Sequence, residues 1–268
     1  MHTILRAPCW CLCALVACDG AAWNVYETPL GGNARVGLNK GVTVNLNTNT
    51  RLRTSVGDTA YEVTIERGEA FFRVGSSPLQ VVVHDVSISA TDSSFDVRDY
   101  GNGSVDIVPL KGLVHIDPVR ADGASSVVSA RRADQVVWAG QLAAVQGGRV
   151  ELHNLGRSAG QRKVMWTSGM LEFVDESVED IVAEFNRYNR TRLKVEDPAI
   201  GCRRIGGRFL ISDIDGFVAT LGRVVDMRIE TSQESSGAVV HLDRLPGTAA
   251  ANALACRRGA DRETRDER

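Results

Sequence analysis

The chain has 268 residues, a formal net charge of -2, 43% hydrophobic residues and 6% aromatic residues. This composition is typical of a globular protein with one large domain or two small ones. The chain is not basic enough for a nucleic-acid groove, so we expect no nucleic acid among its partners. The six cysteines show neither a metal-site spacing nor a disulfide framework, and Cys202 and Cys256 stand alone.

Residues 1–22 are expected to form a signal or membrane-anchor segment. Arg6 precedes an apolar run from Ala7 to Ala17, which is short for a membrane span but suits the hydrophobic part of a secretion signal. The end of this run, Leu15-Val16-Ala17-Cys18, resembles a bacterial lipoprotein cleavage box, which implies a lipid on Cys18. Asp19 resembles the signal that keeps lipoproteins at the inner membrane. The alternative is a chance apolar stretch that contains a cysteine.

From Arg35 to Leu152 the hydrophobic pattern has a period of two, in short segments separated by Gly, Asn, Asp and Ser. The predicted strands include residues 42–46, 61–65, 79–83, 95–97 and 105–107. The lone Gly101-Asn102-Gly103 between two of them is expected to be a hairpin loop rather than a phosphate cradle. Over residues 30–152 the sequence therefore predicts an all-β domain of many short strands, either a sandwich or solenoid-like.

After Leu152 the pattern changes. Val178, Ile181, Val182 and Phe185 recur at helical spacing, and Ser177 with Asp180 provides an N-terminal cap. This helix lies between predicted strands at 170–173 and 192–195. A second unit has a strand at 208–211, a cap at Asp213 or Asp215, an apolar helix face of Phe217, Val218 and Leu221, and a strand at 227–229.

These two units predict a small βαβ-repeat domain over residues 164–232, so the chain as a whole is expected to be α+β. Residues 154–163 are polar and contain glycine, which predicts a linker between two separately packed domains. Residues 243–268 end in a charged run and are expected to form a disordered tail.

Several of these residues also resemble a known family. The block Arg67-Gly68-Glu69-Ala70-Phe71-Phe72-Arg73-Val74, together with Val42, Val44, Phe95, Val97 and Ala139-Gly140-Gln141, is similar in order and spacing to the periplasmic domain of FecR-type proteins. Residues 181–189, Asp197-Pro198 and 206–209 resemble the C-terminal part of that family, which looks like the short N-terminal domain of secretins and TonB-dependent receptors. The resemblance extends from Ala34 to about Ile229.

The resemblance implies a non-enzymatic periplasmic regulator without a cofactor. Such a protein relays the state of a TonB-dependent outer-membrane receptor, through the receptor's N-terminal signalling domain, to an extracytoplasmic-function sigma factor, commonly for iron-siderophore uptake. It also suggests that residues 12–23 are the remnant of a transmembrane helix, which would anchor the chain to the inner membrane in place of a lipid. The family's cytoplasmic region would precede that helix, so contact with the sigma factor is expected only if such a region is restored.

One family position differs. Where the family has Gly-Thr-x-Phe, this chain has Asp92-Ser93-Ser94-Phe95, which puts the tight backbone expected there in doubt.

Catalytic and metal-binding motifs are not evident. The five histidines, at positions 2, 84, 115, 153 and 241, lack a ligand spacing, and His84-Asp85 is not accompanied by a Gly-x-Ser-x-Gly motif. The alternative to the regulator is a secreted or lipid-anchored, β-rich carbohydrate-active or binding protein. The many strands and the carboxylates of Asp92, Asp96 and Asp106 are its only support.

Four residues are predicted to bind the receptor domain. Glu184, Arg187 and Tyr188 lie off the apolar stripe of the helix or at its margin and are expected to face outward, and Arg208 lies on the predicted strand 208–211. The alternative is that Arg187 only solvates the helix and that Tyr188 closes the core.

Overall fold

A computed structural model of the chain describes residues 23–38, 41–56, 61–118, 135–225, 227–235 and 237–245. The predicted signal segment with Cys18, and residues 246–268 of the predicted tail, lie outside these ranges. Within them, no helix is long and apolar enough to cross a membrane. The described chain is mostly β, with many short strands arranged in sheets.

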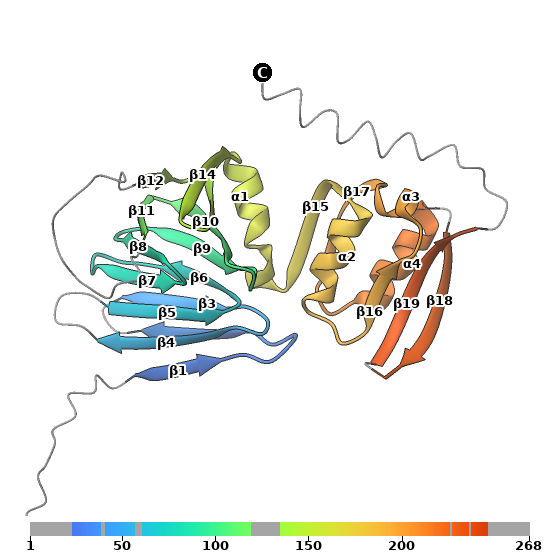
Figure 1. Ribbon diagram of the computed structural model, residues 1–268, viewed down its shortest axis with the longest axis horizontal. Helices are drawn as coiled ribbons and strands as arrows, with labels where there is room; N and C mark the ends of the chain where they lie inside the picture. Colours follow the sequence, from blue (N-terminus) through green and yellow to red (C-terminus); the bar gives the residue numbers. More distant parts are fainter. Residues whose placement is uncertain are drawn as a thin grey trace, which may run out of the picture.

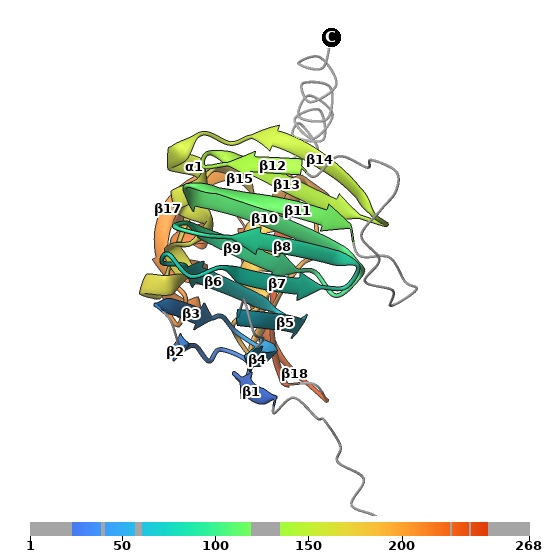
Figure 2. The same ribbon diagram turned by 90° about the vertical axis from the view of Figure 1, so that its left-hand side faces the viewer.

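The first part of the chain forms two seven-stranded sheets. In spatial order, sheet A contains β1 (Asn24–Glu27), β4 (Arg51–Val56), β5 (Tyr61–Arg67), β7 (Leu79–Val83), β8 (Val86–Ala90), β11 (Leu113–Pro118) and β12 (Gln135–Trp138). Sheet B contains β14 (Arg149–Asn154), β13 (Gln141–Gln146), β10 (Ser104–Lys111), β9 (Ser94–Asp99), β6 (Glu69–Arg73), β3 (Val42–Leu46) and β2 (Ala34–Leu38). We call these two sheets together the β unit. Figure 2 shows its strands stacked from β1 at one end to β14 at the other.

Alternation along the strands produces the core of the β unit. Val42, Val44 and Leu46 of β3 are buried, whereas the intervening Thr43 and Asn45 are only partly covered. Apolar side chains from the inner faces of both sheets form one continuous cluster, because each sheet can bury one face only against the other. The strands predicted within residues 42–107 are therefore confirmed.

Two turns of the β unit bear on the sequence comparison. Gly101 and Gly103 have φ values of 75° and 83° and connect β9 to β10, so the predicted hairpin loop is confirmed. Asp92, at the family's glycine position, has a φ of 47°. The tight left-handed backbone is thus kept without glycine, because aspartate tolerates this conformation better than most residues.

The second part of the chain, which we call the C-terminal unit, mixes helices and strands. Its elements are α1 (Arg157–Lys163), the 3-10 helix η1 (Met165–Ser168), β15 (Met170–Ser177), α2 (Val178–Asn186), β16 (Arg192–Val195), α3 (Pro198–Gly201), β17 (Arg204–Leu210), α4 (Ile214–Val224), β18 (Met227–Glu234) and β19 (Gly237–Arg244). Figure 1 shows this unit beside the β unit, with α2 near their boundary.

The local signals for the two longer helices of this unit are confirmed. The Ser177 hydroxyl accepts a hydrogen bond from the Asp180 amide at the start of α2, and Asp213 does the same for the Gly216 amide at the start of α4. All four members of the predicted apolar stripe of α2 are buried.

The strand pairing differs from a βαβ repeat. The first strands of the two predicted units, β15 and β17, pair with each other, whereas β16 and β18 both pair with β19, in the order β16-β19-β18. The sequence analysis did not predict β19, which continues to Arg244. The predicted end of the domain, at residue 232, therefore falls before this strand. The predicted start of the tail, at residue 243, falls inside it.

Two further expectations are wrong. Residues 157–163 of the predicted linker form α1, and Gly160 is buried where this helix meets Val108 of sheet B. Cys202, expected to stand alone, is disulfide-bonded, and the other five cysteines lie outside the described residues.

A second apolar cluster fills the C-terminal unit. Stacked rings of Phe185 and Phe217, with centroids 4.2 Å apart, lie in it together with Trp166. Phe71, from the outer face of sheet B, is also buried in this cluster. The C-terminal unit therefore packs against the outer side of sheet B, and the division into two domains remains a prediction.

Candidate functional site

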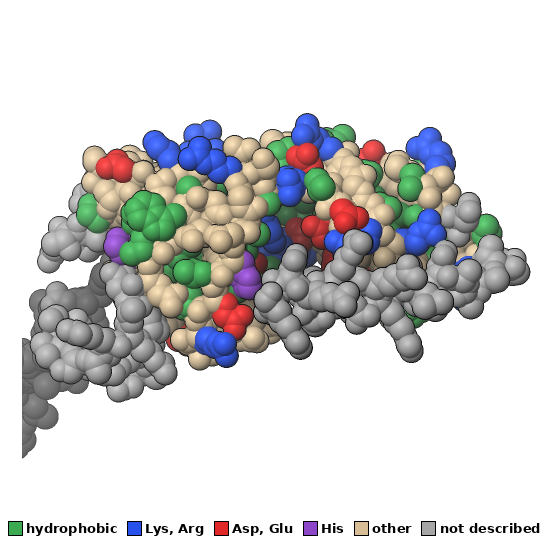
Figure 3. Space-filling view, turned by 90° about the horizontal axis from the view of Figure 1, so that it is seen from above, with side chains coloured by type: hydrophobic (Ala, Val, Ile, Leu, Met, Phe, Trp, Pro, Cys, Tyr) green, Lys and Arg blue, Asp and Glu red, His purple; other side chains and the backbone are tan. Residues whose placement is uncertain are grey.

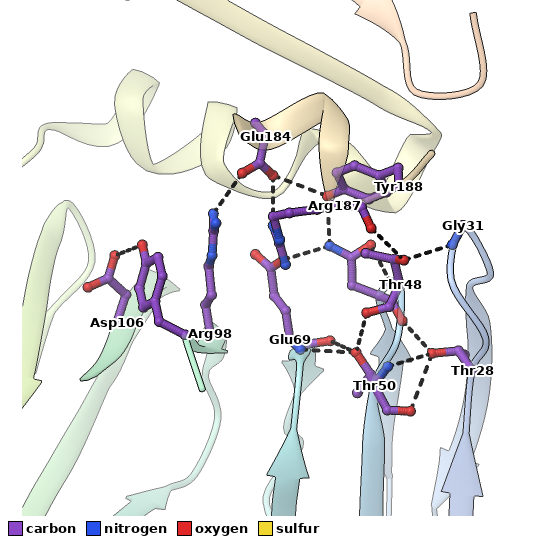
Figure 4. A network of polar contacts seen from close by, with 12 residues as sticks. Thr28, Gly31, Thr48, Thr50, Glu69, Arg98, Asp106, Glu184, Arg187 and Tyr188 are labelled. Carbon is purple, nitrogen blue, oxygen red and sulfur yellow. Dashed lines mark hydrogen bonds and ion pairs between the residues drawn. The ribbon is translucent and has the colours of Figure 1, made fainter. Parts of the chain in front are cut away.

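A group of charged side chains lies where the C-terminal unit meets sheet B (Figure 4). Arg187 Nη2 donates to Glu69 Oε2 at 2.7 Å, and Arg187 Nη1 donates to Glu184 Oε1, also at 2.7 Å. Arg98 Nη1 lies 3.0 Å from the other oxygen of Glu184. These four residues alternate in sign and connect β6 and β9 to the end of α2. We call them, with their neighbours Asn47, Asp96 and Tyr188, the junction.

Neutral groups complete the junction. Asn47, just after β3, donates its side-chain amide to Glu69 at 2.6 Å and to the Tyr188 hydroxyl at 2.8 Å. The Thr48 hydroxyl donates to the carbonyl of Arg187 at 3.1 Å. A Cβ on Gly31 would lie 2.7 Å from the carbonyl oxygen of Tyr188, so the loop before β2 also approaches the end of α2 closely.

The conformation of Gly68 positions Glu69. Gly68 has a φ of 94°, and a Cβ there would lie 2.6 Å from Thr50 Cα, so only glycine fits. This close approach lets the Thr50 hydroxyl accept from the Glu69 amide at 3.0 Å and donate to the Glu69 carbonyl at 3.1 Å. The Gly68-Glu69 pair in the family block therefore has a physical reason: it fixes a carboxylate at the start of β6.

The prediction that Glu184, Arg187 and Tyr188 face outward is wrong. Tyr188 is 5% exposed, and the side chains of Arg187 and Glu184 are 21% and 18% exposed. They lie off the apolar stripe of α2, as expected, but the β unit covers that side of the helix. The alternative, in which Tyr188 closes a core, agrees better with the structure, although its hydroxyl is bonded to Asn47.

Burial and pairing set the charge states in the junction. Burial alone would raise the pKa of Glu184, but the guanidiniums of Arg187 and Arg98 hold it below its ordinary value. Burial would lower the pKa of Arg187, whereas the carboxylates of Glu69 and Glu184 raise it. Both groups are thus charged around neutral pH, and each depends on the other because an unpaired buried charge is unfavourable.

Arg208 lies in a different setting, on the exposed face of β17. Its side chain is 58% exposed and forms an ion pair with Glu172 of β15 at 3.1 Å. Among the described residues β17 pairs only with β15, so its other edge is open. A groove of about 540 Å³ lies between β17 and α4, lined in part by Arg208, Phe209, Phe217 and Arg223.

The two glycines of β17 shape this groove. A Cβ on Gly207 would lie 2.8 Å from the ring of Phe209, so this ring folds over Gly207 and meets Phe217 edge-on, with centroids 5.2 Å apart. A Cβ on Gly206 would lie 3.2 Å from the Phe173 carbonyl. The strand therefore presents backbone rather than bulky side chains around Gly206.

The described residues contain no group of three or more His, Cys, Asp and Glu side chains suited to a metal ion. Of the three carboxylates that support the carbohydrate-active alternative, Asp96 is buried in the junction and Asp106 accepts from the Tyr100 hydroxyl at 2.8 Å. Asp92 forms the turn before β9.

One arrangement of side chains, around His241, was not predicted from the sequence. His241 Nε2 lies 2.8 Å from the Ser232 hydroxyl, and His241 Nδ1 lies 2.7 Å from Glu196. The order resembles a hydrolase triad, but none of the three residues lines the groove beside β17. We assign it a structural role, linking β18, β19 and the end of β16.

The surface charge is mixed. Figure 3 shows acidic and basic side chains interspersed over the face that it presents, including the region where the two units meet. This distribution agrees with the formal net charge of -2.

Comparisons with known proteins agree with this architecture. A search of curated proteins found no match. Two crystal structures of a candidate anti-sigma factor from Parabacteroides distasonis have the same fold. The one at 2.50 Å resolution is 18% identical, with a TM-score of 0.63, and the match covers 84% of this chain and 100% of that one. The one at 1.65 Å resolution is 17% identical, with a TM-score of 0.64, and the match covers 83% of this chain and 99% of that one.

A family model described as FecR protein matches residues 24–115. This range contains Gly68, Glu69 and the strands from β1 to the first half of β11, and it ends well before Ile229, where the predicted resemblance stopped. Beyond residue 115 the likeness is one of fold. The similarity of this chain to the FecR family thus covers residues 24–115.

Proposed function

We propose that this protein is a regulator of an extracytoplasmic-function sigma factor that responds to a TonB-dependent outer-membrane receptor, in iron-siderophore uptake. The family match over residues 24–115 carries this proposal. The likeness in fold to a candidate anti-sigma factor supports it, because that likeness extends through the C-terminal unit. Contact with the sigma factor would need a cytoplasmic region ahead of the described residues.

The open edge of β17 is the proposed contact for the receptor's N-terminal signalling domain. An edge strand offers unpaired backbone groups to which a partner can add a strand, and the groove beside it offers the aromatic floor of Phe209 and Phe217. Arg208 is exposed at this edge, and arginine is among the residues that dominate interface energetics. Glu184, Arg187 and Tyr188 are better placed to hold the C-terminal unit against the β unit.

Calorimetric titration of the full chain with the N-terminal signalling domain of a TonB-dependent receptor encoded beside this protein's gene would test this proposal. We expect Arg208→Ala to weaken binding by about 1 to 2 kcal/mol. Arg228→Ala is the matched control, because Arg228 is also exposed and ion-paired, but on β18. If the unmodified chain does not bind the domain, the receptor relay is wrong; if Arg208→Ala binds normally, the contact lies elsewhere.

The proposed location is the periplasm, with residues 1–22 or a lipid on Cys18 as the anchor to the inner membrane. Alkaline phosphatase fused after Leu245, behind the last strand, is expected to be active because it folds only after export. A fusion at Gly160 would disturb α1. An inactive phosphatase fusion, together with an active cytoplasmic reporter at the same site, would exclude this location.

A further inference from the structure

The junction contains a third carboxyl group, that of Asp96 in β9. Asp96 is 3% exposed, and its Oδ1 atom has no hydrogen-bond partner among the described residues. Its register partner on β6 is Phe71, which is buried under the C-terminal unit, so Asp96 lies on the outer face of sheet B. Glu69 lies two residues before Phe71 on the same face of β6, so its carboxyl group and that of Asp96 are diagonal neighbours on the sheet. Two carboxyl groups this close cannot both be ionised at low cost.

The charges around Asp96 balance without it. Beside it on the outer face of sheet B lie Glu69 of β6 and Arg98 of its own strand. These two pair with Arg187 and Glu184 at the end of α2, and Asn47 and Tyr188 add neutral groups. Two guanidiniums neutralise two carboxylates, and both guanidiniums are already paired. An ionised Asp96 would add one unpaired negative charge in a covered site, whereas a protonated Asp96 can donate its O–H to Glu69.

We propose that Asp96 and Glu69 share one proton and that this pair makes the junction a releasable latch. While Asp96 holds the proton, Glu69 is free to pair with Arg187 and the C-terminal unit is held against sheet B. When Asp96 releases the proton to solvent, two carboxylates compete for Arg187 and the contact between the units weakens. No other atom is exchanged.

The direction of the pH effect follows from the carboxyl groups of Asp96 and Glu184, whose pKa values are shifted in opposite directions in the folded protein. Burial first, and then Glu69, raise the pKa of Asp96 well above its ordinary value. The stability that the protonated Asp96 contributes is complete below its unfolded pKa of about 3.9 and is lost as pH rises through the folded pKa. The pKa of Glu184 is lowered, so its contribution is present above its unfolded pKa and is lost as pH falls. Above about pH 5, only the first effect operates.

Asp96→Asn is the decisive variant, because an asparagine amide can donate to Glu69 as a protonated carboxyl does but cannot ionise. Urea unfolding of the purified full chain would be followed from pH 5 to pH 8. We expect the folding equilibrium constant of the variant, relative to that of the unmodified chain, to rise with pH by up to about tenfold per pH unit until the folded pKa is reached. A ratio that does not change over this range would overturn the latch.

Asp106→Asn is the matched control. This substitution removes a carboxyl group from β10, the neighbouring strand of the same sheet. That carboxyl group accepts a hydrogen bond from the Tyr100 hydroxyl and does not face Glu69. The folding equilibrium constant of Asp106→Asn, relative to that of the unmodified chain, is expected to stay constant from pH 5 to pH 8. An equal rise in both variants would mean that the effect belongs to general charge on the sheet, and would also overturn the latch.

Two measurements separate a local latch from global unfolding. Amide hydrogen exchange, compared at equal pH, is expected to be slower in Asp96→Asn within residues 184–190 and 66–74 at pH 8, and equal at pH 5. Carbon-13 spectra of the unmodified chain are expected to show one aspartate carboxyl that titrates well above the ordinary aspartate pKa of about 3.9, a readout that remains if Asp96→Asn does not fold. Aspartates that all titrate at or below that ordinary pKa would overturn the proposal. Neither measurement uses a receptor, so its outcome is independent of the receptor-binding test.

Discussion

Arg187 and Arg208 belong to the same small unit and each pairs with a glutamate, but the two pairs lie in opposite settings. Arg187 is 2.7 Å from Glu69, with side chains that are 21% and 4% exposed. Arg208 is 3.1 Å from Glu172, with side chains that are 58% and 27% exposed. The first pair joins two parts of the chain that are 118 residues apart, whereas the second links adjacent strands.

The difference separates holding the fold together from being available to a partner. An exposed ion pair contributes about 0 to 1 kcal/mol, because water and salt screen it. Removing one member of a buried pair leaves the other charge without compensation, which costs about 3 to 5 kcal/mol. Arg187, at the edge of the apolar stripe of α2, therefore has a structural role, whereas Arg208, on the edge strand β17, remains available for binding.

The largest effect is expected from Arg187→Ala. This substitution leaves Glu69 and Glu184 without their shared cation and should lower the free energy of unfolding by about 3 kcal/mol. Urea unfolding near neutral pH would measure it. A loss below about 0.5 kcal/mol, the scale of a surface substitution, would mean that the junction does not hold the units together.

Gly68→Ala tests whether the backbone at the start of β6 positions the junction. The new Cβ would meet Thr50 at a residue with a φ of 94°, and we expect a loss of about 2 kcal/mol. Thermal unfolding provides the measurement. Gly101→Ala is the control for left-handed backbone alone, because its φ is 75° and a Cβ there meets nothing within 4 Å. Equal losses in both variants would assign the effect to backbone strain rather than to the contact with Thr50.

Tyr188→Phe removes one hydroxyl from the junction and leaves the ring in place. Asn47 loses one acceptor but keeps Glu69, so the expected loss is about 1 kcal/mol. Chemical unfolding in parallel with Tyr26→Phe would isolate the effect, because Tyr26 packs at the margin of the first cluster. If the two substitutions have the same effect, the Tyr188 hydroxyl adds nothing to the contact.

Arg208→Ala should have the smallest effect on folding. Its exposed ion pair predicts a change within about 0.5 kcal/mol, even though the same substitution is expected to weaken receptor binding. Unfolding of the same preparation used for calorimetry would establish this. A loss comparable to that of Arg187→Ala would remove the distinction between the two arginines.

The elements that the sequence predicts are those that depend on neighbouring residues. Alternation placed β3, helical spacing placed α2, and Ser177 and Asp213 marked the two helix starts, because each signal lies within a few residues of the element. The pairing of strands and the burial of charge depend on distant partners. A stripe of Val178, Ile181, Val182 and Phe185 identifies one covered face of α2 but contains no information about a second.

The candidate site shows the same division. Arg208 was expected on an exposed strand and lies on one. Glu184 and Arg187 are charged, lie off the apolar stripe, and would be solvated on an isolated helix, yet Glu69 and Arg98 from a distant sheet compensate them. The Gly68-Glu69 dipeptide of the family block is the sequence signal for a carboxylate held in a fixed place. It does not identify Arg187 as the partner of that carboxylate.

The interleaved strands of the C-terminal unit have a consequence for how it forms. β16 and β18 join a sheet only through β19, the last strand before residue 245. In a growing chain that has not yet reached Gly237, β16 and β18 would therefore have no strand to pair with. The apolar cluster around α2 and α4 would also lack the side chains of β19. The sheet β16-β19-β18 can form only once the eight residues of β19 are present. We therefore expect a stop codon before Gly237 to abolish this sheet, whereas the pairing of β15 with β17 does not depend on β19.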